Sequence, residues 1–137
     1  MIVADTNLIA YFLIHGADTE AAKQVYDADP VWIAPPQWRS EFLNVLWLYH
    51  RAAALSEDSA IAIWHAAQVL VASEQEPDPL LVLRTAIRSG ISPYDAQFVA
   101  LAEILETRVV TADRPLAQRC PDRVILMSDF ARGASQE

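Results

Sequence analysis

Four acidic residues of this 137-residue chain stand where carboxylates could do chemistry: Asp5, Glu41, Asp95 and Asp113. Asp5 directly follows the short apolar segment Met1–Ala4, and Asp113 stands two residues after the segment Arg108–Thr111. Both segments are expected to be strands of a parallel sheet. Because ligands of such sheets bind beyond the carboxyl ends of the strands, both acids are expected at one edge of the sheet.

The other two acids lie on predicted helices. Glu41 flanks an apolar stripe at helical spacing, formed by Trp38, Phe42, Val45, Leu46 and Tyr49. A lone carboxylate beside such a stripe is costly unless it is paired or bound to a metal. Asp95 heads the apolar face of the helix that opens at Ser92-Pro93, which favours a position at the inward edge of that helix.

Each acid also has a purely structural explanation, and singly these explanations stay open. Asp5 and Asp113 can be helix N-caps. Asp95 is the third residue after Ser92, which is the acidic position of a capping box. Glu41 can form a salt bridge, for instance with Arg39 or Arg84.

Together the four acids favour a metal site. Carboxylates gathered at one edge raise one another's pKa values, and the chain has one lysine, Lys23, to neutralise them. One or two divalent cations are the expected remedy, and oxygen-only ligands select Mg²⁺ or Mn²⁺. Such ions polarise a phosphoryl oxygen and activate water, so the pattern predicts hydrolysis of phosphodiesters.

Other kinds of site fit the sequence less well. The three glycines, Gly16, Gly90 and Gly133, form no phosphate-binding loop, which excludes a Rossmann or P-loop nucleotide site. The opening Asp5-Thr6-Asn7 lacks the paired aspartates of haloacid-dehalogenase-type phosphatases, and Lys23 cannot serve as the lysine of a receiver domain. The single cysteine, Cys120, excludes an internal disulfide and a cysteine-rich zinc site.

The net charge of −8 bears on partners. It is not the charge of a protein that holds nucleic acid on a broad basic face, so RNA binding would need local arginines and metal ions. An acidic surface also suits a basic protein partner. No apolar run is long enough to span a membrane and no basic leader precedes Asp5, so we expect a cytoplasmic protein.

The elements that must position the acids alternate between strand and helix. Strands are expected at Met1–Ala4, Val31–Ala34, Arg108–Thr111 and Val124–Met127, with a loop or short edge strand at Glu74–Asp78. Helices are expected at Asn7–Ile14, Thr19–Asp27, Pro36–Arg51, Ser56–Ala72, Pro79–Ser89 and Ser92–Glu106. This order predicts one α/β domain over residues 1–130, a short parallel sheet with helices on both faces, and a flexible tail over residues 131–137.

These residues resemble the PIN domain, and within it the VapC-type toxins of type II toxin–antitoxin pairs. The resemblance rests on Ile2–Asn7, on Ser40-Glu41 with Asn44, on SPYDAQFVALA at Ser92–Ala102 and on VVTADRPL at Val109–Leu116. It extends from Met1 to about Phe130, and the last two motifs are its specific part.

The resemblance implies a metal-dependent endoribonuclease whose ligands are Asp5, Glu41, Asp95 and Asp113. It also implies that Asn7 and Thr111 orient those carboxylates. An RNA substrate, a homodimer and a small DNA-binding antitoxin are the partners that it implies. The alternatives are a nuclease of RNA maturation, a DNA nuclease, and a PIN-like module that binds RNA or protein without cutting.

Overall fold

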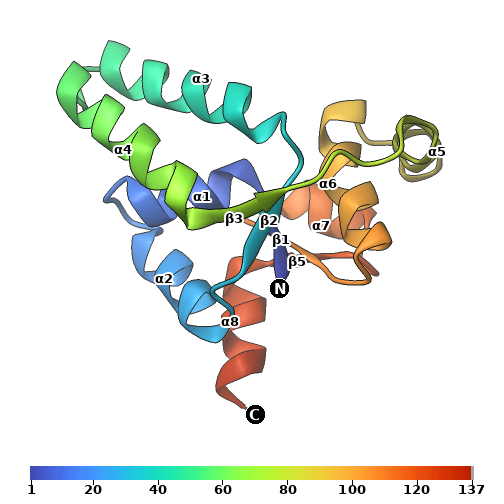
Figure 1. Ribbon diagram of the computed structural model, residues 1–137. Coiled ribbons are helices and arrows are strands. Elements are labelled where there is room, and N and C mark those ends of the chain that lie inside the picture. The colour runs from blue at the N-terminus through green and yellow to red at the C-terminus, as the bar shows by residue number, and fades with distance from the viewer. Residues whose placement is uncertain (137) are drawn as a thin grey trace.

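The computed structural model describes residues 1–136, which form five strands and eight helices (Figure 1). The strands are β1 (Ile2–Ala4), β2 (Trp32–Ala34), β3 (Val71–Glu74), β4 (Val109–Thr111) and β5 (Val124–Leu126). The helices are α1 (Thr6–Leu13), α2 (Thr19–Ala28), α3 (Trp38–Arg51), α4 (Glu57–Leu70), α5 (Pro79–Ser89), α6 (Pro93–Ile104), α7 (Arg114–Arg119) and α8 (Met127–Ser135).

The strands form one sheet in the order β3-β2-β1-β4-β5, and every neighbouring pair is parallel. In the central strand, Val3 lies opposite Ile33 of β2 and Val109 of β4. All three residues of β1, β2 and β4 are buried, as expected of parallel strands that helices cover on both faces. The predicted single α/β domain with a parallel sheet is confirmed.

The sheet has a topological switch point between β1 and β4. From β1 the chain continues to β2 on one side, whereas β4 pairs with the other side of β1. Connections therefore leave in opposite directions at the carboxyl ends of these two strands, which is where ligands of such sheets bind, and we call this edge of the sheet the crevice. Asp5 follows β1 and Asp113 follows β4, so both acids stand at this crevice.

Helices α3 and α4 form a hairpin that extends away from the sheet (Figure 1). Its base is an aromatic cluster in which the ring of Trp64 stacks at 6.0 Å from Trp38 and 6.3 Å from Phe42. Trp38 and Phe42 are fully buried. This packing fixes the first turn of α3, which carries Glu41.

Two elements differ from the sequence predictions. The helix expected to reach Ala72 ends at Leu70, and Val71–Glu74 pairs with β2 as an edge strand. The backbone groups along the free edge of β2 need a partner, and this tertiary demand outweighs the local helical pattern.

The second difference is at the C-terminus. The predicted tail begins at Ala131, but α8 continues to Ser135 and packs against α2, with Met127 and Ala131 buried. Met127 accordingly begins this helix instead of ending the last strand. Gln136 caps this helix, and the last residue of the predicted tail, Glu137, lies outside the described residues.

Candidate active site

Asp5 is a buried carboxylate at the N-cap of α1. Its Oδ1 accepts a hydrogen bond from the Thr6 backbone N–H at 2.8 Å, so the predicted capping role is present. Its Oδ2 accepts a bond from the Thr111 hydroxyl at 2.6 Å. Burial raises the pKa of Asp5 to about 6; the charges of Glu41 and Asp95 also raise this pKa, and the two hydrogen bonds lower it.

Thr111 and Asn7 connect the ends of β1 and β4. The Thr111 Oγ1 donates its one proton to Asp5 and accepts bonds from Asn7 Nδ2 at 3.2 Å and from the Asp113 backbone N–H at 3.0 Å. The Asn7 Oδ1 accepts from the Ala112 backbone N–H at 3.1 Å. These bonds hold the Asp5 side chain and the loop before Asp113 in one network.

Glu41 lies half-buried in the first turn of α3. Its Oε1 accepts from the Thr6 hydroxyl at 3.3 Å and from Gln37 Nε2 at 3.2 Å. Burial raises the pKa of Glu41, and the Asp95 charge raises it further against the effect of the two bonds.

Asp95 and Asp113 stand at the starts of α6 and α7. The Asp95 backbone N–H donates to Ser92 Oγ at 3.1 Å, and the Leu116 backbone N–H donates to Asp113 Oδ1 at 3.0 Å. Asp113 thus caps α7 as its structural alternative predicted, whereas α6 is capped by the Ser92 side chain and Asp95 lies in its first turn. Burial raises the pKa of Asp95, and the neighbouring charge of Asp113 adds to the rise.

The four acids interact electrostatically as one group. Asp5 interacts with Glu41 and Asp95, and Asp95 interacts with Asp113. Within residues 1–136 no Lys, Arg or His nitrogen lies within 4.0 Å of any of these carboxylates. Arg39, one predicted partner of Glu41, pairs with Glu74 at 2.6 Å instead. The protein thus holds four acids near one another without a counter-charge.

The sequence pattern did not predict two supporting residues. The Thr6 hydroxyl donates to Glu41. Gln37 bonds Glu41 and also donates to the Tyr94 backbone carbonyl at 2.7 Å, which ties the start of α3 to the start of α6. The i, i+4 spacing of Gln37 and Glu41 was the available signal; the long-range bonds had none.

The donor chemistry fits a hard divalent cation, because every carboxylate offers oxygen and one of them is buried without a counter-charge. Among residues 1–136, however, no three acidic, His or Cys side chains converge closely enough to surround one ion. In this arrangement no more than two of the acids would bind the same ion directly.

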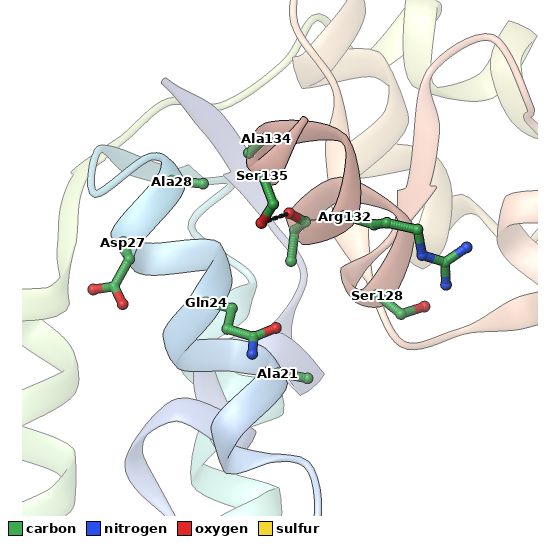
Figure 2. A pocket seen from close by; sticks show the side chains of 9 residues that line it. Ala21, Gln24, Asp27, Ala28, Ser128, Arg132, Ala134 and Ser135 are labelled. Carbon is green, nitrogen blue, oxygen red and sulfur yellow. Dashed lines mark hydrogen bonds between the residues drawn. The ribbon is translucent and has the colours of Figure 1, made fainter. Parts of the chain in front are cut away.

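A separate hollow of about 670 Å³ lies between α2 and α8 (Figure 2). Ala21, Gln24 and Ala28 of α2 face small side chains of α8, and Ser135 bonds the Ala131 carbonyl at 3.0 Å. None of the four acids lines this hollow. The chemistry suggested by the sequence therefore belongs to the crevice and not to this hollow.

Comparison with known proteins agrees with this geometry. The sequence pattern of the PIN domain family matches residues 2–120. The chain belongs to the PIN domain family. The resemblance of the sequence to the PIN domain is thereby confirmed. The matched residues include all four acids of the crevice.

Two proteins of Pyrobaculum aerophilum are similar to this PIN domain. Ribonuclease VapC3 is 32% identical over 85 residues, which are 59% of this chain and 65% of the relative. The crystal structure of PAE2754 superimposes with a TM-score of 0.77 at 18% identity, covering 99% of this chain and 90% of that one. The second likeness shows the fold. Residues 1–136 contain no helix long and apolar enough to cross a membrane.

Proposed function

We propose that this PIN domain is a Mg²⁺- or Mn²⁺-dependent endoribonuclease with its active site at Asp5, Glu41, Asp95 and Asp113. The observation that carries the proposal is the uncompensated group of acids at the switch point between β1 and β4, with a buried Asp5 whose pKa is raised to about 6. Proteins rarely bury charge without a partner, and a cation would remove the mutual repulsion. The name of the relative, Ribonuclease VapC3, supports RNA as the substrate.

The residues of the chain have distinct tasks in this proposal. Asp5, held by the Thr111 hydroxyl and the Thr6 N–H, presents a fixed carboxylate. Thr6 and Gln37 hold Glu41 toward the same crevice. One or two bound divalent ions would polarise the phosphoryl oxygen and lower the pKa of the attacking water. Hydrolysis then adds that water to phosphorus and releases the leaving oxygen with a proton.

The direct test is cleavage of RNA by the purified protein with EDTA, Mg²⁺ or Mn²⁺. We expect cleavage only with the divalent ion, and its loss in Asp95→Asn. Asp78→Asn is the matched control, because Asp78 likewise lies at the start of a helix, α5, but outside the crevice. Undiminished cleavage by Asp95→Asn would contradict the assignment of the site.

A module that binds RNA or protein without cutting is the second candidate. It is favoured by the lack of three converging ligands among residues 1–136. Titration with Mn²⁺ separates the two candidates: saturable binding that Asp5→Asn and Asp95→Asn both weaken supports the nuclease. Absence of saturable binding supports the module.

We further propose that the protein is the toxin of a type II toxin–antitoxin pair and acts in the cytoplasm as a homodimer. Helix α5 exposes an apolar stripe, Leu80, Leu83 and Ile87, which suits contact with a second copy. The α3–α4 hairpin carries an apolar groove with Leu43, Trp47 and Ile61 in its lining, which suits a segment of an antitoxin. A short reading frame beside the gene that encodes a DNA-binding protein would support the pair. Growth arrest on expression, relieved by that neighbour, is its test.

A further inference from the structure

A cleft of about 220 Å³ opens between the C-terminal half of α5, the C-terminal half of α6 and the loop from α7 to β5. Three arginines line it: Arg88, Arg119 and Arg123. They are three of the ten cationic side chains of a protein whose net charge is −8. With Glu103 and Asp122 also in its lining, the cleft carries a formal net charge of +1, against −9 for the rest of the chain.

Within residues 1–136 these three arginines form no ion pairs. Glu103 and Asp122 also line the cleft, yet within residues 1–136 neither lies within 4.0 Å of an arginine nitrogen. Arg88 and Arg119 are exposed, and Arg123 uses one N–H for the Thr107 carbonyl at 3.2 Å. Guanidinium donors thus remain free to bind an anion from outside.

The position of Arg119 is set by its neighbour. Its Nη1 lies 3.0 Å from where a Cβ on Gly90 would stand, so its guanidinium rests against the bare backbone of that glycine. Buried side chains, including Thr85, Val99 and Cys120, also line the cleft. Arginine guanidinium groups beside one cleft suit the recognition of a phosphate, which each can bind through two N–H groups.

Two helices connect this cleft to the acidic crevice. Helix α6 carries Asp95 in its first turn and Glu103 near its end, about 12 Å further along the axis. Helix α7 is capped by Asp113 and ends at Arg119, about 9 Å away. A short single strand of nucleic acid could follow these helices from one site to the other.

We propose that Arg88, Arg119 and Arg123 form a phosphate-binding site that holds the backbone of the RNA substrate remote from the scissile bond. This inference rests on the proposed ribonuclease function. A chain with a charge of −8 repels RNA in general, so a local arginine cleft gives the strand a place to attach while the acids act on a phosphodiester some nucleotides away.

The first experiment tests the phosphate site alone. Amide NMR spectra of the full chain are recorded with inorganic phosphate against sodium chloride at equal ionic strength. We expect saturable shifts at Thr85, Gly90 and Arg123, and their loss in Arg88→Gln/Arg119→Gln. The absence of saturable shifts would overturn the site. Shifts that persist in the double variant would overturn it as well, because they would show an adventitious ion only.

The second experiment distinguishes RNA from free phosphate. Fluorescence anisotropy measures binding of a 12-nucleotide RNA, a size on the order of known single-strand sites, in EDTA so that no cleavage occurs. Arg88→Gln/Arg119→Gln is expected to weaken binding at least about fivefold and to lower the salt slope by about 0.7 for each lost phosphate contact. Glu103→Gln is expected to tighten binding, a gain that misfolding cannot produce.

The matched control is Arg84→Gln/Arg132→Gln, which removes the same charge from α5 and α8 outside the cleft. Equal weakening in both double variants would mean a general charge effect and overturn the inference. So would phosphate shifts without any effect on RNA, or tighter binding of a polyglutamate peptide than of RNA. If RNA is cleaved but the cleft variants bind it like the wild type, this inference fails and the proposed function stands. If the cleft binds RNA but no divalent metal supports cleavage, the proposed function fails and the phosphate site stands.

Discussion

Asp5 makes the stability of the metal-free protein depend on pH. Its pKa is about 6 in the folded chain and near 3.8 in an unfolded one. Between these values the folded protein keeps a proton that the unfolded chain has lost, so the free energy of unfolding falls as pH rises through about 6. The loss amounts to about 3 kcal/mol, and the raised pKa values of Glu41 and Asp95 act in the same direction.

In EDTA we therefore expect a lower Tm at pH 8 than at pH 5, measured by calorimetry. Asp5→Asn serves as the control, because without the titrating carboxyl its Tm should change less over this range. A Tm that rises toward pH 8 equally in both proteins would contradict the raised pKa.

The same residue predicts a conflict between stability and activity. Asp5→Asn removes a buried charge while the amide oxygen can still accept from Thr6, so its metal-free Tm at pH 8 should exceed that of the wild type by several degrees. RNA cleavage should fall at least about a hundredfold, since metal binding loses a central carboxylate. Loss of activity together with a lower Tm would indicate a merely structural cap.

Thr111 is expected to act through Asp5. Thr111→Val removes the hydroxyl that lowers the pKa of Asp5, so the acid limb of the pH–activity profile should move to higher pH. Activity at pH 7 should fall about 10- to 100-fold. Thr111→Ser keeps the hydroxyl and should restore both. An unchanged profile in the valine variant would show that the bond does not tune the site.

At the scale of elements, the end of α5 depends on Gly90. Its φ is +66°, and a Cβ there would meet Arg119 Nη1 at 3.0 Å. Gly90→Ala should therefore lower the free energy of unfolding by about 1 kcal/mol or more. Gly133 in α8 has no atom within 4 Å of its added Cβ, so Gly133→Ala should be neutral or stabilising by a few tenths of a kcal/mol. Urea denaturation compares the two, and equal effects would refute this reading of Gly90.

Most helix boundaries followed from local signals. Asp78-Pro79 and Gly90 mark the two ends of α5, and Ser92-Pro93 marks the start of α6, as the sequence predicted. The end of α4 could not be predicted from local signals, because the helix stops before Val71 and Val71 pairs with Trp32 of the neighbouring strand. Helix α8 was also missed, since a sequence with Gly133 and small residues gains its helical stability from packing on α2.

At the scale of the whole molecule, the stripe on α5 predicts the oligomeric state. Leu80, Leu83 and Ile87 are 62%, 51% and 72% exposed. If they form the proposed homodimer contact, Ile87→Glu should shift the sedimentation coefficient from dimer to monomer. Leu43→Glu is the control, because Leu43 is also exposed, at 51%, but lies on the α3–α4 hairpin, and this variant should remain dimeric. A wild-type monomer at micromolar concentration would contradict the proposal.

The sequence by itself determined the four candidate site acids, the parallel α/β class and the family pattern. Its short apolar runs that end in Asp5 and near Asp113 carry that information locally, because a strand end and a helix cap depend on few residues. Glu41 beside an apolar stripe was equally visible, since helical spacing alone places it there.

Only the tertiary structure decided how these acids are held. The pairing of β4 with β1 brings Thr111 to Asp5 across 106 positions of sequence, and Gln37 reaches Tyr94 from α3 to α6. The tertiary structure also brings Arg88, Arg119 and Arg123 from three segments of the chain to one cleft. No local pattern predicts such contacts, because hydrogen bonds and charges act through space and the fold alone sets which distant residues become neighbours.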